Sequence, residues 1–176
     1  MIPEAEADIA LDFYRLSVGT FLRQLDHLDH ILAKAQEHVA DERAEESVLL
    51  AGRLFPDQLN FTRQVQLATD FAKNSCAQLA GLEAPKIDHM EHSLSELRQR
   101  IAKTASFIKG IPQEAFAGAV SRDMQVLQRE CKVAVSGEHF VLDYALPNFY
   151  FHYTTAYGIL RHLGLTIHKS DYVGPM

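Results

Sequence analysis

One apolar seam at helical spacing runs through the first part of the chain. Its members follow one another every three or four residues and are Leu11, Tyr14, Val18, Phe21, Leu25, Leu28, Leu32 and Ala35. A stripe held at this spacing for more than three heptads is typical of a long amphipathic helix. The seam therefore predicts a first helix over residues 8–39 and directs the chain towards a helical fold.

A second helix is predicted by the next periodic segment. Residues 47–54 indicate a short helical lead-in, and Pro56 then marks a new start, because proline is tolerated in a first turn. Apolar residues continue at helical spacing as far as Gly81, a residue that commonly ends helices. The second helix is expected over residues 57–80.

The third and fourth helices have recognisable ends. Ser93 and Glu96 fit a capping box, in which each side chain satisfies a free backbone N–H group, so the third helix is expected to open at Ser93 and to end at Gly110. The fourth is expected over residues 137–162, with Gly164 after its last turn.

Residues 113–135 interrupt the helical rhythm. Side chains alternate at period two over 131–135, and residues 124–127 could pair with them, which predicts a small β-hairpin or irregular excursion. Long helices with modest connections otherwise predict an all-α fold, a four-helix bundle formed as a single domain by residues 1–176.

Charge and cysteine content narrow the function classes. The 176 residues include 17 Lys and Arg against 23 Asp and Glu, a net charge of -6, which argues against nucleic-acid or anionic-membrane partners. No uninterrupted apolar run reaches membrane-spanning length, and the acidic N-terminus does not resemble a signal peptide. Cys76 and Cys131 lie outside any CxxC motif. The expected location is the cytoplasm.

Nine histidines raise the question of a metal site. His27 and His30 have metal-ligand spacing, but with Leu25 and Leu28 facing the core, both histidines are expected on the outer surface. Others lie near predicted helix ends or in loops, namely His38, His89, His92, His139 and His168.

The fourth predicted helix carries a polar stripe inside its apolar face. Asn148, His152 and Thr155 fall within about 60° of one another on a helical wheel. His162 lies close to the same phase at the far end of the helix and is a minor candidate.

The second predicted helix shows a similar pattern. Asp57 and Gln64 share an arc of about 80° with Phe61, and a buried carboxylate is costly unless it is paired or bound to a cation. Two helices that aim polar groups inward predict an interior pocket for a small-molecule ligand, with aromatic walls from Phe61, Phe149 and Phe151.

Each polar residue also has a structural interpretation. Asp57 can cap a helix start, His152 can bond a backbone carbonyl in the core, and Gln64 can point at a loop.

Several segments together resemble a known family, named domain of unknown function 1993. These segments are Ala-Leu-Pro-Asn-Phe-Tyr-Phe-His-Tyr-Thr-Thr-Ala-Tyr at 145–157 with its continuation to 164, and residues 53–57, 63–68 and 169–172. That family resembles the DinB/YfiT-like metalloenzymes. The resemblance implies a four-helix bundle of up-down-down-up topology, commonly a homodimer, in which three histidines bind a divalent metal and some members activate a small thiol or water.

Carried over by position, the resemblance places His152 on the second histidine of the HxxxH motif of helix four and Asn148 on the first. The helix-two histidine falls near Gln64 or Gln66. Any zinc, nickel or manganese ion would therefore depend on His152 and Asp57 with water, because amides are poorer ligands than imidazole.

Three hypotheses follow. The first is a metal-assisted hydrolase or small-thiol transferase, with His152 as ligand or general base and Asp57 as second ligand or orienting carboxylate, while Asn148 and Gln64 position the substrate. The second is a non-catalytic bundle that binds a small molecule in the same pocket. The third is a structural bundle in which the polar stripe fixes helix register in a dimer.

Overall fold

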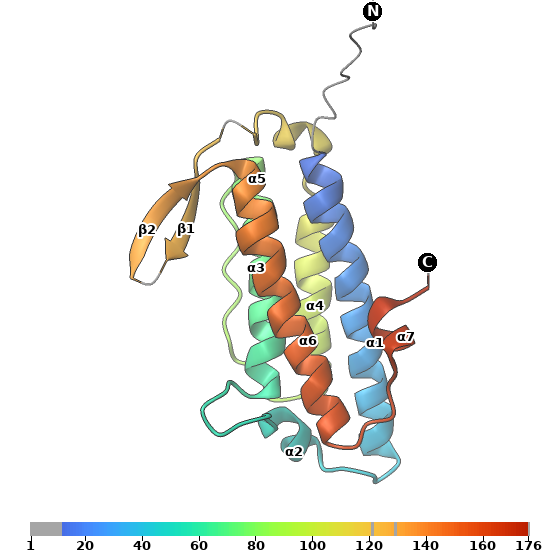
Figure 1. Cartoon of the computed structure of the whole chain (residues 1–176). Coiled ribbons are helices and arrows are strands. Elements are labelled where there is room, and N and C mark those ends of the chain that lie inside the picture. The colour runs from blue at the N-terminus through green and yellow to red at the C-terminus, as the bar shows by residue number, and fades with distance from the viewer. Residues whose placement is uncertain (1–11, 121, 129, 176) are drawn as a thin grey trace, which may run out of the picture.

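Four long helices lie side by side in the computed structural model, which describes residues 12–120, 122–128 and 130–175 (Figure 1). They are α1 (Thr20–Ala40), α3 (Phe61–Ala80), α4 (Leu94–Lys109) and α6 (Leu146–His162). Shorter elements connect or extend them: η1 (Arg15–Gly19), α2 (Glu46–Ala51), η2 (Gln113–Phe116), α5 (Gly137–His139), η3 (Phe140–Ala145) and α7 (Lys169–Val173). The prediction of a mostly helical chain is confirmed.

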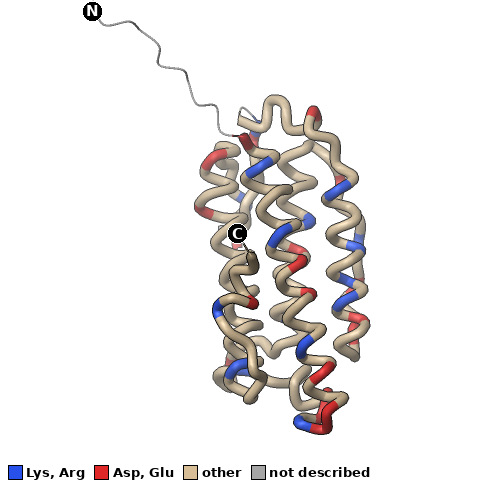
Figure 2. The backbone as a smooth tube through the Cα atoms, turned by 90° about the vertical axis from the view of Figure 1, so that its right-hand side faces the viewer, with Lys and Arg blue, Asp and Glu red and all other residues tan. Residues whose placement is uncertain are grey.

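The four long helices run in two directions. Figure 1 shows α1 and α6 descending while α3 and α4 ascend. Residues 82–93 therefore cross back along the helices before α4 begins. Helix α3 packs against both α4 and α6, and α1 packs against α4. Lys and Arg positions are interspersed with Asp and Glu positions along the helices in Figure 2.

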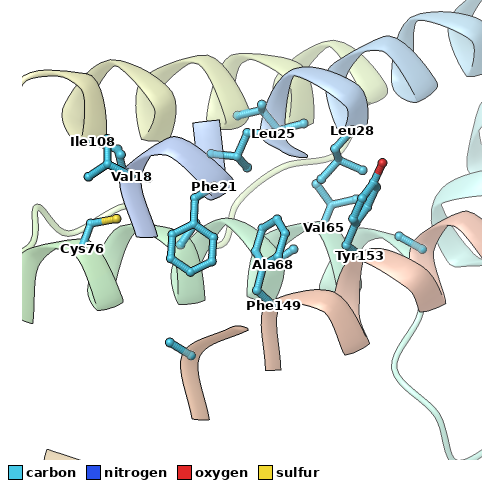
Figure 3. Packing of buried hydrophobic residues seen from close by; sticks show 14 of the residues in the cluster. Val18, Phe21, Leu25, Leu28, Val65, Ala68, Cys76, Ile108, Phe149 and Tyr153 are labelled. Carbon is cyan, nitrogen blue, oxygen red and sulfur yellow. The ribbon is translucent and has the colours of Figure 1, made fainter. Parts of the chain in front are cut away.

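The seam of the first helix faces the core, as its periodicity predicts. Phe21, Leu25 and Leu28 are completely buried. Figure 3 shows Phe21 pointing towards Phe149 of α6, and the two ring centroids lie 5.0 Å apart in an edge-on arrangement. Predicted residues 8–11 of this helix lie outside the described part of the chain. Within the described part, η1 leads directly into α1.

The second long helix begins later than predicted. Asn60 is its N-cap, because the Asn60 side chain accepts a hydrogen bond from the backbone N–H of Arg63 at 3.0 Å. Pro56 and Asp57 instead form a turn between α2 and α3. Gly81 ends the helix as expected, in a left-handed conformation with φ of 69°.

The start of α4 at Ser93 is confirmed, with one difference in its cap. Ser93 Oγ accepts a hydrogen bond from the backbone N–H of Glu96 at 3.1 Å. The Glu96 carboxylate accepts from the backbone N–H of His92 at 2.5 Å, one residue before the position that a capping box predicts.

The crossover of residues 82–93 is held by a buried arginine. Arg100 of α4 is 1% exposed, and its guanidinium donates to Asp70 of α3 at 2.6 Å and to Glu91 of the crossover at 3.0 Å. Burial of a charge on this scale requires such pairing. Although burial acts to raise the pKa of Glu91, hydrogen bonds from Arg100 and Gln66 hold it below its usual value.

The predicted hairpin is confirmed. Strands β1 (Met124–Gln128) and β2 (Cys131–Val135) pair antiparallel, with Met124 opposite Val135. Met124 and Val126 are buried, so one face of β1 anchors the hairpin to the helices. The predicted fourth helix is continuous through α5, η3 and α6, and the π-helical turn η3 comes just before Pro147, which cannot donate a backbone hydrogen bond.

The prediction that His27 faces solvent is wrong. His27 is only 7% exposed, because the C-terminal segment that contains α7 lies over this side of α1 and brings Gly174 against the imidazole. His30 is exposed as predicted.

Among the described residues, no helix combines the length and the apolar character needed to cross a bilayer.

Candidate functional site

The interface between α3 and α6 brings two of the predicted site residues into direct contact. His152 Nδ1 lies 2.7 Å from Gln64 Oε1, and both side chains are buried. Gln64 occupies the first turn of α3, which the Asn60 cap holds in place, and His152 faces it from the middle of α6. The separate polar stripes predicted on these helices therefore meet at this pair.

The hydrogen bonds of Gln64 determine which imidazole nitrogen carries the proton. Gln64 Nε2 donates to the backbone carbonyl of Leu59 at 3.1 Å, so Gln64 Oε1 is the acceptor that faces His152. His152 Nδ1 must then be the donor. The neutral ring consequently keeps a lone pair on Nε2, and Nε2 has no hydrogen-bond partner within the described ranges.

Aromatic rings enclose the imidazole. Phe71 stacks on His152 with centroids 5.5 Å apart and planes at 18°, and Phe151 meets the ring edge-on at 5.2 Å. Burial lowers the pKa of His152, and the nearby positive charge of Arg63 lowers it further. His152 is therefore neutral at neutral pH and able to accept a proton or a hydrogen bond at Nε2.

The other predicted polar residues do not join this pair. Asp57 is exposed in the turn before α3, so the prediction that it points into the core is wrong: the turn at Pro56 takes it out of the helical phase. The Asn148 amide donates to the carbonyl of Tyr144 at 2.7 Å, and the Thr155 hydroxyl donates to that of Phe151 at 2.7 Å. Both side chains thus bond to their own helix.

The predicted aromatic walls divide between core and surface. Phe61 and Phe149 are fully buried in the apolar core, whereas Phe151 is 61% exposed beside His152. His162 is exposed at the end of α6. Phe71, which sequence reasoning missed, stacks on the face of the His152 ring; its position two helical turns after Gln64 was the available signal.

The donor set around His152 does not fit a three-histidine metal centre. Its direct polar partner is the amide of Gln64, and the Asn148 amide is turned to the backbone. Within the part of the chain that the structure describes, no three His, Cys, Asp or Glu side chains are grouped so as to hold a metal ion. Binding of a divalent ion by His152 and Asp57 stays a prediction.

A cavity of about 320 Å³ lies on the hairpin side of Phe71. Its walls come from α3, the hairpin and η3, and include Phe71, Asn74, Ser75, Lys132, Phe140 and Tyr144. Ser75, whose side chain lines the cavity, is only 2% exposed. Apolar walls with a few free polar groups are characteristic of small-molecule sites.

Comparison with known proteins identifies the family. Residues 13–173 match the model of a family described as a domain of unknown function, DUF1993. The chain belongs to the DUF1993 family. The resemblance expected from the segments around His152 is thereby confirmed.

A solved structure supports the same relationship for this DUF1993 chain. A crystal structure described as a DinB family member protein from Shewanella denitrificans is 42% identical to it, with a TM-score of 0.85. The match covers 93% of this chain and 92% of the other. A search of curated proteins found no match.

Proposed function

We propose that this DUF1993 protein is a DinB-type four-helix bundle that binds a small organic molecule beside His152 without a three-histidine metal centre. The antiparallel arrangement of α1 and α6 against α3 and α4 supports the up-down-down-up topology. The observation that carries the proposal is the hydrogen bond from His152 to Gln64, which leaves one lone pair of a neutral imidazole available.

The cavity behind Phe71 is the proposed ligand space. Phe71 touches the His152 ring and also forms part of the cavity wall, so a ligand there would lie against the same aromatic group that supports the imidazole. Its volume of about 320 Å³ lies within the range of small-molecule pockets. Ser75, Asn74 and Lys132 supply groups that can orient a polar ligand.

A thermal-shift screen over a metabolite library tests this proposal. A ligand at 100 times its dissociation constant should stabilise the protein by about 2.7 kcal/mol. Ser75→Leu should abolish the response by filling the cavity, whereas Ser106→Leu, at an exposed position on α4, should leave it unchanged. A library without any stabilising compound, or a hit that Ser75→Leu binds equally well, would contradict the proposal.

Acid–base catalysis by His152 is a second candidate function. Gln64 fixes the imidazole tautomer and leaves Nε2 to take a proton from a substrate that contacts His152 directly, outside the Phe71 cavity, which His152 does not line. The exposed position of Asp57 offers no orienting carboxylate. Loss of turnover in Gln64→Leu with binding retained would support it.

The homodimer is a further part of the proposal, and light scattering at several concentrations tests it.

A further inference from the structure

A second cavity, remote from Phe71, lies between α1 and the C-terminal segment. Its volume is about 460 Å³. The residues that line it on the α1 side include Asp26, His27, Asp29 and His30, and Asp171 and Gly174 close it from the C-terminal side. The cavity joins the histidine pair of the first helix, which the proposed function leaves unused, to three carboxylates.

The C-terminal segment is firmly attached over this cavity. Tyr172 stacks on Tyr153 of α6 with centroids 4.3 Å apart and planes at 9°, and Tyr153 donates a hydrogen bond to the Tyr172 carbonyl at 2.8 Å. Asp171 accepts hydrogen bonds from Lys34 of α1 at 2.5 Å and from the backbone N–H of His168 at 2.7 Å. The cavity wall is therefore a built part of the fold.

Two of the three carboxylates are already neutralised by partners. Asp29 receives both arms of the Arg98 guanidinium at 2.8 Å, and Asp171 pairs with Lys34. Asp26 has no hydrogen bond or ion pair with any described residue, although it lines the same cavity. One uncompensated negative charge consequently faces the cavity.

His27 supplies a second and independent observation. The residue is 7% exposed, and neither nitrogen of its ring has a hydrogen-bond partner among the described residues; Nδ1 is completely enclosed. Gly174 lies close to Nε2, since a Cβ added there would be 1.9 Å from that atom, and both residues line the cavity. Buried polar groups are rarely left without a partner, so the His27 ring has capacity for a further hydrogen bond.

We propose that this cavity binds a small primary ammonium ion. The Asp26 carboxylate would pair with the ammonium charge, and Nε2 of His27 would accept one of its N–H groups. The apolar tail would lie against Ala33 and Pro175, which also line the cavity. This site is separate from the one beside His152, so either proposal can fail without the other.

Thermal denaturation of the full chain with n-butylammonium chloride tests the inference, with n-butanol and potassium chloride at equal concentrations as controls. We expect a rise in melting temperature with butylammonium alone. Asp26→Asn should abolish this rise, and because Asp26 is exposed the variant should fold normally. Asp143→Asn makes the same charge change on η3, outside the cavity, and should respond like the unmodified protein.

The NMR signals of the histidine rings distinguish binding at this cavity from a general salt effect. Butylammonium should shift the His27 ring resonances in a saturable titration and leave those of His139 on α5 unchanged. Absence of saturation, an equal thermal response in Asp26→Asn, or stabilisation by zinc or manganese chloride with none by butylammonium would each overturn the proposal.

Discussion

Gln64 accepts a hydrogen bond from His152 across the interface of α3 and α6, with 2.7 Å between Gln64 Oε1 and His152 Nδ1. This contact joins one residue from each of the two predicted polar stripes and orients the imidazole. It also satisfies two buried polar groups at a point where the surrounding side chains are mainly aromatic and apolar.

Gln64→Leu is expected to destabilise the fold by about 1–3 kcal/mol, because it leaves the buried His152 Nδ1–H without an acceptor. Adding His152→Phe should recover much of the loss, since replacing both partners by apolar groups can be nearly neutral. Urea denaturation of both single variants and the double variant measures the coupling. If the losses of unfolding free energy in the two single variants simply added up in the double variant, the predicted coupling between Gln64 and His152 would be wrong. Thr155→Ala is the control: it loses only a hydrogen bond within α6 and should change stability by about 0.5 kcal/mol or less.

The stability contributed by neutral His152 should depend on pH. Its pKa in the folded protein lies below the usual histidine value of about 6.5 in an unfolded chain, because of burial and then Arg63. The unfolded state therefore binds more protons between these two values. The contribution is fully present above about pH 6.5 and is lost as pH falls through the folded pKa.

Urea denaturation at a series of pH values from 8 to 5 measures this effect, using about one pH unit between points. The slope of unfolding free energy against pH should be smaller in His152→Gln than in the unmodified protein. An identical slope in the two proteins would show that His152 does not carry the dependence.

Local patterns predicted most of the helices and the hairpin because each is encoded by neighbouring residues. The seam that includes Phe21 and Leu25 is buried as its spacing requires, and the alternation at 131–135 becomes β2. Ser93 caps α4 through a contact only three residues away. Such signals need no knowledge of tertiary structure.

The prediction errors had two causes, a helix start misplaced by a few residues and contacts with segments that are distant in the sequence. A helical wheel assigns Asp57 a direction only if Asp57 is helical, and the cap at Asn60 excludes it from α3. The helical wheel correctly placed His27 on a different side of the helix from Leu25. It could not show that Gly174, from the far end of the chain, covers that side. The contact between Gln64 and His152 likewise requires the packing of α3 on α6.

Arg100→Met should destabilise the protein by about 3–5 kcal/mol, because it removes the buried guanidinium that pairs with both Asp70 and Glu91. Arg98→Met is the matched control: its pair with Asp29 is about one-third exposed and should contribute about 1 kcal/mol or less. Urea denaturation measures both. Equal losses would contradict the structural role of Arg100 in holding the crossover.

Gly174→Ala should detach the C-terminal segment from α1. Gly174 has φ of 72°, which strains an alanine, and its added Cβ would lie within 1.9 Å of His27 Nε2. Hydrogen exchange should then quicken over residues 169–175 and at the α1 face that they cover. Gly164→Ala separates the two causes, since φ there is 91° but no atom lies within 4 Å of the added Cβ. If backbone strain alone mattered, Gly164→Ala and Gly174→Ala would each speed hydrogen exchange in their own segment to a similar extent. If the contact with His27 matters, hydrogen exchange at the covered face of α1 should rise only in Gly174→Ala.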